Sequence, residues 1–435
     1  MPASPPPAAP PLRLGIAGLG TVGVGVVRIV QQHAALLAAR TGRAITISAV
    51  CASSRHKNRA VDISAYAWED DPVALARRPD VDLVIELIGG ENGPAKATVE
   101  AALTAGKDVV TANKALLARH GQALAEKAEA AGRALRFEAA VAGGIPVIKT
   151  LGEGLAGNAV TRVMGVMNGT CNYILTRMES AGLPYDTVFE EARQLGYLEA
   201  DPQLDVGGID AAHKLALLAA MAFGCRVDFD AIDLQGIGAI SIDDIHLARD
   251  MGYAIKLLGV AQMTGRGLEQ RMTPCLVPET HPLAQLQGGT NMVVLEGDAL
   301  GQLVLRGAGA GEGPTASAVM GDVADIARGL RLPVFGQPAA SLTQAPPAVV
   351  SAAAPWYLRM TLQDKPGALA KIATVLGDAG ISIDRMRQYG HDDAHAPVLI
   401  VTHKASSDDI RVALDGFAAT GVLVAEPVAL RIEQV

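Results

Sequence analysis

LRLGIAGLGTVGVGVVRIV (residues 12–30) reads as a short apolar strand, a glycine-rich turn and an apolar helix. Gly18, Gly20 and Gly23 match the pattern G-x-G-x-x-G, in which the first glycine permits a tight turn, the second lets a pyrophosphate approach the backbone, and the third allows close helix packing. The pattern alone is weak evidence in a chain with 47 glycines. Because it directly follows a strand at the start of the globular chain, it predicts a dinucleotide site.

Strands and helices continue to alternate after this unit. Further strands are expected at 82–90 and 107–114, and helices at 97–106 and 115–132. Such alternation predicts a Rossmann-type, doubly wound parallel sheet over residues 12–148, in which ligands bind at the carboxyl ends of the strands. Lys114 lies at such an end and is a candidate cation in the cofactor cleft. A lysine that caps a strand at the rim of the sheet explains it as well.

The second strand (44–50) runs into CASSRHKNR (51–59), where a fold that prefers NAD usually carries an acid for the ribose 2′-hydroxyl. No acid is present there. Ser53, Arg55 and Lys57 can instead hold a 2′-phosphate by charge-assisted hydrogen bonds, so NADP is favoured over NAD. A solvated basic loop is the alternative interpretation.

The segment ARQLGYLEADPQLDVGGIDAAHK (192–214) concentrates carboxylates, glycines and one lysine. Asp210 and Lys214 are four residues apart, so a helix places them on one face. A carboxylate beside a lysine can bind an ammonium group and hold a lysine that exchanges a proton with a substrate oxygen, which favours an amino-acid substrate. An ordinary surface pair, worth about 0.3 to 0.5 kcal/mol, is an equal alternative for these two residues taken alone.

Composition limits the function classes. The chain has 435 residues, half of them hydrophobic, and a net charge of -8 without a lysine or arginine block, which argues against nucleic acid or an anionic membrane as a partner. Its four cysteines form no C-x-x-C pair, so neither a zinc site nor a disulfide framework is indicated. Residues 1–11 are rich in proline and alanine and predict a disordered leader without signal-peptide character. No run of 18 apolar residues occurs, and a cytoplasmic location is expected.

The remaining chain predicts two further domains. An α+β substrate and dimerisation domain is expected over 149–313, followed by a helix around 314–330 that returns to the nucleotide domain. Residues 337–355 have the composition of a linker. Residues 356–435 predict a βαββαβ order, which is ferredoxin-like.

Several motifs together resemble the homoserine dehydrogenase family over residues 12 to about 330. They are GLGTVG (18–23), ELIGG (86–90), TANK (111–114), EAAVAGGIP (138–146), NGTCNYIL (168–175) and the acidic segment that ends at Lys214. The C-terminal part resembles an ACT-type regulatory domain, on the strength of DKPGALAKIATVL (364–376).

The resemblance implies site residues. Lys214 would transfer the proton to or from the substrate oxygen, with Lys114 in the same pocket and Asp210 beside them. Glu199, Asp205 and Asp210 would bind the substrate amino group. Cofactor contacts would come from Gly18, Leu19, Gly20, Thr21, Val22, Gly23, Arg55, Lys57, Lys114, Gly311 and Glu312.

A turn after the first domain's last strand carries the pattern of a cation site. Glu138 is followed by a bent turn whose carbonyls at Val141, Gly143 and Ile145 can coordinate a hard cation. The resemblance implies a monovalent cation at these four residues, with sodium the expected ion.

The implied activity is the NAD(P)-dependent interconversion of L-homoserine and L-aspartate 4-semialdehyde, in threonine, methionine and isoleucine biosynthesis. Feedback by an amino acid such as threonine and a homodimer or homotetramer are expected from the ACT-type domain. One rival is a dehydrogenase of another semialdehyde. Another is a non-catalytic metabolite sensor, against which the two lysines argue.

Overall fold

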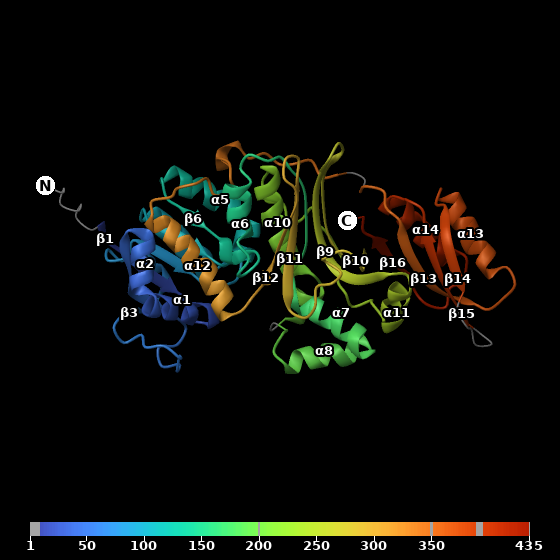
Figure 1. Cartoon of the computed structure of the whole chain (residues 1–435), viewed down its shortest axis with the longest axis horizontal. Coiled ribbons are helices and arrows are strands. Elements are labelled where there is room, and N and C mark those ends of the chain that lie inside the picture. The colour runs from blue at the N-terminus through green and yellow to red at the C-terminus, as the bar shows by residue number, and fades with distance from the viewer. Residues whose placement is uncertain (1–8, 199–200, 349–350, 389–394, 435) are drawn as a thin grey trace. The chain divides into compact units, whose positions relative to one another are not determined.

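A computed structural model describes residues 9–198, 201–348, 351–388 and 395–434 (Figure 1). Contacts divide the chain into two compact units, each built from separate stretches. The first unit comprises Met1–Val163, Asp210–Ile232 and Thr290–Ala345. The second unit comprises Met164–Ile209, Asp233–Gly289 and Pro346–Val435.

The first unit contains a six-stranded sheet in the order β3-β2-β1-β4-β5-β6, with every neighbouring pair parallel. This order confirms the predicted Rossmann-type sheet. The strands are β1 (Ala9–Ala17), β2 (Arg43–Cys51), β3 (Ala67–Glu69), β4 (Leu83–Glu86), β5 (Asp108–Thr111) and β6 (Leu135–Arg136). The connecting helices are α1 (Thr21–Gln32), α2 (Ala34–Thr41), α3 (Pro72–Arg77), α4 (Pro94–Thr104) and α5 (Lys114–Ala130).

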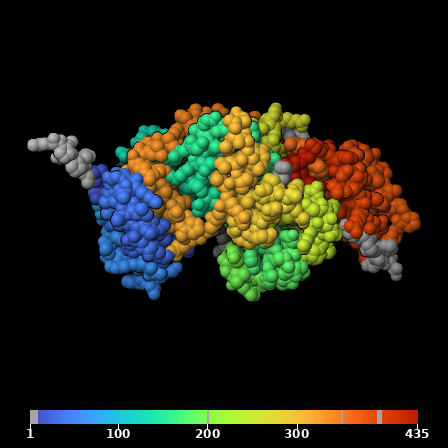
Figure 2. Space-filling view, in the orientation of Figure 1, coloured from blue at the N-terminus to red at the C-terminus, as the bar shows by residue number. Residues whose placement is uncertain are grey.

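Every residue of β4 and β5 is buried, as expected for central parallel strands that helices cover on both faces. A late helix, α12 (Glu312–Ala327), contributes Val319 and Val323 to the same core and packs against α1. Figure 2 shows this orange helix beside the blue surface of α1 and α2. Among the described helices none alone meets the length and hydropathy of a membrane span. The α1–α2 pair passes only when joined, and it bends by 80°.

The first unit also contains most of α10 (Ile209–Phe223), from Asp210 onward. Residues 210–220 of α10 are all buried, so this helix is a core element on every side. The other elements of this unit are η1 (Glu138–Ala140), α6 (Val147–Lys149), the π-helical turn η2 (Thr150–Gly154), β11 (Thr290–Gly297), β12 (Gly301–Ala308) and η3 (Ala339–Ser341). β11 and β12 form an antiparallel hairpin. Strand β7 (Val160–Val166) crosses the boundary.

The second unit combines a helical part with a sheet that runs β9-β10-β16-β13-β15-β14. Its first elements are α7 (Gly169–Ala181), α8 (Tyr185–Gln194), α9 (Pro202–Val206), β8 (Asp233–Leu234), α11 (Ile242–Asp250), β9 (Tyr253–Thr264) and β10 (Gly267–Pro278). The C-terminal module follows with β13 (Trp356–Gln363), α13 (Ala368–Asp378), β14 (Ile383–Gln388), β15 (His395–Thr402), α14 (Ser407–Ala419) and β16 (Val428–Ile432). This is the predicted βαββαβ order.

Alternation along β13 explains how the C-terminal module packs. Leu358, Met360 and Leu362 face a core shared with α13 and α14, which Figure 1 shows lying along the sheet. Arg359 points to the other face, where its Nη2 donates to Asp244 Oδ2 of α11 at 3.0 Å. Tyr357 also donates to Asp244, at 2.9 Å. Tyr357 and Arg359 are therefore both held by a helix of the same unit.

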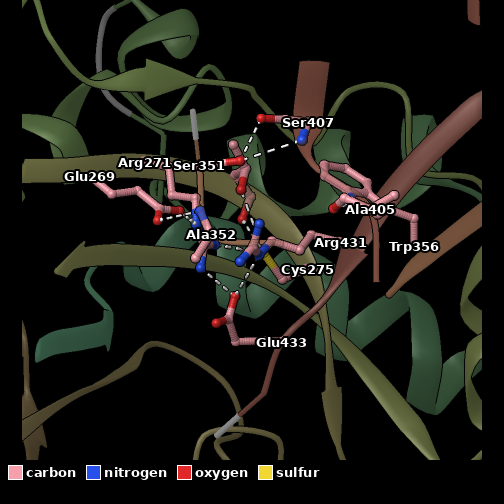
Figure 3. A network of polar contacts seen from close by, with 11 residues as sticks. Glu269, Arg271, Cys275, Ser351, Ala352, Trp356, Ala405, Ser407, Arg431 and Glu433 are labelled. Atoms are coloured by element: carbon pink, nitrogen blue, oxygen red, sulfur yellow. Dashed lines mark hydrogen bonds and ion pairs between the residues drawn. The ribbon is translucent and has the colours of Figure 1, made fainter. Parts of the chain in front are cut away.

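A buried ion network joins β16 to β10, which pair in parallel through Cys275 and Arg431 (Figure 3). Arg271 Nε donates to Glu269 at 3.0 Å, and its Nη2 donates to Glu433 at 2.5 Å. The second oxygen of Glu269 accepts the backbone N–H of Ala352 at 3.0 Å. The end of the chain and the segment before β13 are thus both anchored to β10.

Candidate active site and cofactor pocket

The glycine-rich turn between β1 and α1 has the backbone geometry that the sequence predicts. Gly18 has φ +110°, its N–H donates to Cys51 O at 2.8 Å, and a Cβ there would lie 2.4 Å from Leu87 O. A Cβ on Gly23 would lie 2.1 Å from Gly18 O. A Cβ on Gly20 meets nothing within 4 Å, so open space lies in front of this residue. Close packing therefore demands the first and third glycines, and the second leaves room for a ligand.

Gly20 is also the N-cap of α1, without a side-chain cap and without an acid in the first turn. Thr21 and Val22 are the first residues of this helix. Its N-terminal N–H groups and dipole favour an anion. The residues present thus fit the pyrophosphate of a dinucleotide.

A pocket of about 410 Å³ opens beside this turn. It is lined by Gly18, Leu19, Gly20, Cys51, Ala52, Ser53, Lys57, Arg59, Asp70, Pro72, Leu87, Ile88 and Pro94. Lys57, a predicted cofactor residue, lines the pocket. Arg55 is not a lining residue, and its guanidinium lies over the Trp68 ring at 6.0 Å.

Three residues of this region, Arg59, Trp68 and Asp70, were not identified from the sequence. Arg59 donates to Leu19 O at 3.3 Å, Lys57 O at 3.1 Å and Ser54 O at 2.7 Å, so it ties the basic loop to the glycine turn. Its guanidinium lies 5.8 Å from the Trp68 ring, and Trp68 Nε1 donates to Asp70 Oδ1 at 2.7 Å. Trp68 is one of only two tryptophans in the chain, and this rarity was the available signal.

The ends of β4 and β5 are bonded to each other. Glu86 is fully buried and accepts Thr111 Oγ1 at 2.6 Å and the backbone N–H of Ile88 at 2.8 Å. Asn113 donates to Gly90 O at 2.7 Å and caps α5 by accepting the Leu116 N–H at 3.1 Å. Lys114 follows as the first residue of α5, so these bonds set the position from which its side chain extends.

The three predicted catalytic residues, Lys114, Asp210 and Lys214, come together in the first unit. Asp210 Oδ2 accepts a hydrogen bond from Lys214 Nζ at 2.7 Å, and Asp210 Oδ1 pairs with Lys114 Nζ at 2.8 Å. Burial alone would raise the pKa of Asp210, but the charges of Lys214 and Lys114 outweigh it and hold the pKa well below its usual range. Asp210 is therefore a carboxylate at neutral pH, and it orients two ammonium groups.

This arrangement is suited to chemistry on an oxygen that gains or loses a proton. An ammonium group is a strong hydrogen-bond donor and can stabilise or protonate a developing alkoxide. Lys114 is the more exposed of the two lysines, with 29% of its side chain accessible against 10% for Lys214. The shared carboxylate removes rotational freedom from both, so their donors are positioned before a ligand arrives.

His213 is a neighbour of this group with a different role. Its ring lies 4.5 Å from that of Phe229, and burial, followed by the charge of Lys114, lowers its pKa. A neutral packed histidine, and not a proton donor, is therefore expected at neutral pH.

Asp205, predicted to bind the substrate amino group, lies in the second unit. It is buried and accepts Asn168 Nδ2 at 2.9 Å. Asn168 in turn caps α7 by accepting the Cys171 N–H at 2.7 Å, so two quoted motifs are joined here. Asn168 belongs to a motif quoted from the sequence, but no role was expected for it, and its bond to Asp205 is visible only in the tertiary structure. Glu199 lies outside the described residues.

The predicted cation turn is compact. Gly143 has φ +55°, and a Cβ there would lie 2.4 Å from Gly309 O. Both carboxylate oxygens of Glu138 accept backbone N–H groups, from Ile148 at 2.9 Å and Lys149 at 2.8 Å. Burial, and then the charge of Asp322, raises the pKa of Glu138 to about 7. Among the described residues no three His, Cys, Asp or Glu side chains cluster as metal ligands.

The predicted ligands at this turn are backbone carbonyl oxygens, a donor set that suits a hard cation and not a transition metal, and Ile145 O already accepts the Val147 N–H at 2.8 Å. Because burial raises the pKa of Glu138 to about 7, a bound cation would have to favour its ionised form for this residue to contribute charge. Both of its carboxylate oxygens already accept N–H groups at the start of α6.

Gly311 and Glu312, the predicted late cofactor turn, form the start of α12. Gly311 is its N-cap with φ +117°. The Glu312 carboxylate forms an ion pair with Arg28 of α1. The side chain of Glu312 is thus engaged by the nucleotide domain, which fixes the position of this helix start beside α1.

Family models match most of the chain. One described as "Homoserine dehydrogenase, NAD binding domain" matches residues 18–138, one described as "Homoserine dehydrogenase" matches 146–324, and one described as "ACT domain" matches 356–415. A homoserine dehydrogenase from Neisseria gonorrhoeae is 41% identical over 416 residues, which are 94% of this chain and 95% of that protein. Another from Pseudomonas aeruginosa is 40% identical over 432 residues, or 97% of this chain and 99% of that protein. The crystal structure of a homoserine dehydrogenase from Thiobacillus denitrificans has a TM-score of 0.92 and 38% identity, with 98% of each chain covered.

Proposed function

The chain belongs to the homoserine dehydrogenase family, and from this premise we propose that it interconverts L-homoserine and L-aspartate 4-semialdehyde with NADP as the preferred cofactor. The observation that carries the proposal is the pairing of Lys114 and Lys214 with one buried carboxylate, Asp210. Two positioned ammonium groups suit a reaction that turns a carbonyl oxygen into a hydroxyl.

The reaction requires little of the protein beyond positioning and proton transfer. A reduced nicotinamide cofactor, when bound, supplies the hydride. Lys214 donates a hydrogen bond to the carbonyl oxygen, stabilises the charge that develops there and delivers the proton that completes the hydroxyl. Lys114 holds the same region positive. In the oxidation of homoserine the step runs in reverse, and Lys214, as a neutral amine, receives the hydroxyl proton.

We propose that carboxylates of the acidic segment, Asp205 and Glu199, bind the substrate amino group. Asp205, held by Asn168, is a buried acceptor, and Glu199 lies in the same acidic segment. An ammonium group bound by carboxylates is fixed in direction, which aligns the reacting carbon at the other end of a small amino acid.

The preference for NADP is supported by the chemistry around the second strand. Residues 51–54 are Cys-Ala-Ser-Ser, so no acid follows β2 to bind a ribose 2′-hydroxyl. Lys57 lines the pocket, and Arg55, four residues after β2, lies over the Trp68 ring at 6.0 Å. Replacing both by alanine should lower kcat/KM with NADP much more than with NAD.

A monovalent cation, sodium by expectation, would be bound by the carbonyl oxygens of the turn at Val141, Gly143 and Ile145, with Glu138 supplying charge. Adding sodium chloride should therefore raise the melting temperature more than choline chloride at equal ionic strength. Equal effects of the two salts would remove the cation site from the proposal.

Regulation is assigned to the ACT domain. A pocket of about 410 Å³ is lined there by Asp364, Lys365, Gly367 and their neighbours. A small amino acid fits this volume, and threonine is the expected effector if the enzyme acts in threonine, methionine and isoleucine biosynthesis. A homo-oligomer is part of the proposal, because modules of this type commonly pair between subunits.

The decisive experiment follows reduced nicotinamide by absorbance with homoserine and either NADP or NAD. Wild type should turn over, and Lys214→Met should lose about 10²- to 10⁴-fold in kcat while its dissociation constant for NADPH stays unchanged. Threonine should suppress the wild-type rate. A folded wild type that binds NADPH but never turns over homoserine would overturn the proposal in favour of a metabolite sensor.

A further inference from the structure

One carboxylate lies in the wall of a pocket otherwise suited to phosphate groups. Asp70 follows β3 and lines the same pocket as Lys57, Arg59 and the glycine turn. The neighbouring acids are already occupied, because Glu69 pairs with Arg78 at 2.5 Å and Asp71 caps α3 by accepting the Val73 N–H at 3.0 Å. Asp70 is instead held by Trp68 Nε1 through Oδ1 alone. A ligand in this pocket would thus meet a fixed hydrogen-bond acceptor.

The position of Asp70 separates it from the acid that normally recognises the ribose of NAD. That acid ends the second strand, where this chain has Cys51, Ala52 and Ser53. Asp70 directly follows β3, the next strand outward in the sheet order β3-β2-β1. A carboxylate next to a 2′-phosphate would repel it, so Asp70 must face a part of the ligand that donates hydrogen bonds.

The rest of the pocket wall is suited to a flat, apolar ring. Pro72, Leu87, Ile88 and Pro94 line it. The adenine ring of a dinucleotide is flat, with a single exocyclic amino group that donates hydrogen bonds. Cys51 also lines this pocket, and burial, and then the charges of Asp71, Asp70 and Glu69, raises the pKa of its thiol to about 11.

We infer that Asp70, held by Trp68, is the residue that selects an adenine base, by accepting a hydrogen bond from the 6-amino group through its free carboxylate oxygen. Arg59, whose guanidinium lies over the Trp68 ring, donates to Leu19 O and Ser54 O and so ties the basic loop to the glycine turn beside this subsite. The inference rests on cofactor binding by the proposed dehydrogenase, and it adds a specificity-determining residue that none of the family motifs quoted from the sequence contains.

The inference predicts a specific response to the base. Hypoxanthine carries an oxygen at position 6, an acceptor that a carboxylate repels. Wild type should therefore bind NADPH about tenfold or more tightly than its hypoxanthine analogue, the difference expected when a charge-assisted hydrogen bond is exchanged for a repulsive contact. Asp70→Asn keeps an oxygen for Trp68 and offers an amide N–H in place of the second oxygen. This variant should lose the preference for adenine or reverse it, because the amide can donate to the oxygen of hypoxanthine.

The experiment measures dissociation constants for NADPH and its hypoxanthine analogue by nicotinamide fluorescence, with the corresponding KM values. Asp62→Asn is the matched control, since Asp62 is an acid of the preceding loop that accepts the Ser64 N–H and does not line the pocket. It should keep the wild-type preference. Equal binding of the two bases by wild type would overturn the inference without requiring any variant.

Two further results would also overturn it. Asp70→Asn could weaken both cofactors equally, which would make Asp70 only a tether for Trp68. Asp70→Asn could instead change the ratio of the affinities for NADP and NAD without changing the ratio of the affinities for the adenine and hypoxanthine cofactors. That result would place Asp70 beside the ribose. Failure of wild type to bind any reduced nicotinamide cofactor would instead contradict the proposed function, so the two failures are distinguishable.

Discussion

Lys214 Nζ donates a hydrogen bond to Asp210 Oδ2 at 2.7 Å, across one turn of a helix that is buried on every side at this point. A lysine and an aspartate at this spacing on a surface would contribute little. Here both side chains are about nine-tenths buried, and the second carboxylate oxygen is paired with Lys114. Removing the carboxylate would leave two ammonium groups together in a poorly solvated place.

Asp210→Asn should consequently lower the unfolding free energy by about 3 to 5 kcal/mol, the cost of breaking a buried pair at one partner. Denaturant unfolding measures the difference. Asp230→Asn is the control in the same unit, because Asp230 pairs with Arg119 at 2.8 Å but is 76% exposed. Its effect should stay within about 0.5 kcal/mol.

The loss of stability in Asp210→Asn should also depend on pH. The pKa of Asp210 is lower in the folded than in the unfolded chain, so its contribution to stability is present above the unfolded value and is lost as the pH falls through the folded one. The difference between wild type and Asp210→Asn should therefore be constant near neutral pH and shrink below about pH 4. A difference that grows with acidification would contradict this charge assignment.

Two glycines of the cofactor turn should respond differently to alanine. Gly20→Ala should fold with an almost unchanged melting temperature, because its Cβ meets no protein atom within 4 Å, but it should raise the dissociation constant for NADPH. Gly18→Ala should destabilise the fold, because its φ is +110° and its Cβ would lie 2.4 Å from Leu87 O. Thermal unfolding and cofactor titration on both variants test the pair. Equal cofactor affinity in Gly20→Ala and wild type would remove the turn from the cofactor site.

The burial of Lys256 should be visible in the pH dependence of folding stability. Its side chain is buried on β9 and donates to Leu286 O at 2.6 Å and Asn172 at 3.1 Å, and burial lowers its pKa to about 8. The unfolded chain binds more protons at this residue between about pH 8 and its ordinary value near 10.4, so this lysine favours folding increasingly as the pH rises through that window.

Lys256→Met should remove this dependence. The stability of wild type relative to the variant should increase between pH 7.5 and pH 10, measured by denaturant unfolding at each pH. Lys404→Met, at an exposed lysine of the second unit, should show no such trend. The absence of any relative change in Lys256→Met would mean that the buried amine is solvated better than its surroundings indicate.

The ion network of Figure 3 should be essential to the second unit. Glu433→Gln should lower the unfolding free energy by about 3 to 5 kcal/mol, because Arg271 would remain buried with one carboxylate fewer. Asp408→Asn removes the exposed pair with Arg411 in the ACT domain and should change stability by less than about 1 kcal/mol. Similar effects of the two substitutions would show that the network is hydrated.

Local patterns in the sequence predicted those features that depend on neighbouring residues. The strand, turn and helix at residues 12–30 follow from apolar periodicity and from the steric demands on Gly18 and Gly23. The pairing of Asp210 with Lys214 follows from the helical repeat alone. The family expected from the motifs is confirmed by the family models and the relatives.

Only the tertiary structure revealed the contacts between residues that are distant in the sequence. Lys114 meets Asp210 only because the fold brings α5 and α10 into one unit. The two residues are too far apart in the sequence for helix or strand periodicity to predict their contact. The carboxylate of Glu138 is occupied by the start of α6, which the turn motif did not reveal. Asp70 enters the cofactor pocket because β3 lies beside β2 in the sheet. Sequence periodicity reports local sterics and burial, whereas the convergence of charges is set by long-range packing, which places each charge near its partners and away from water.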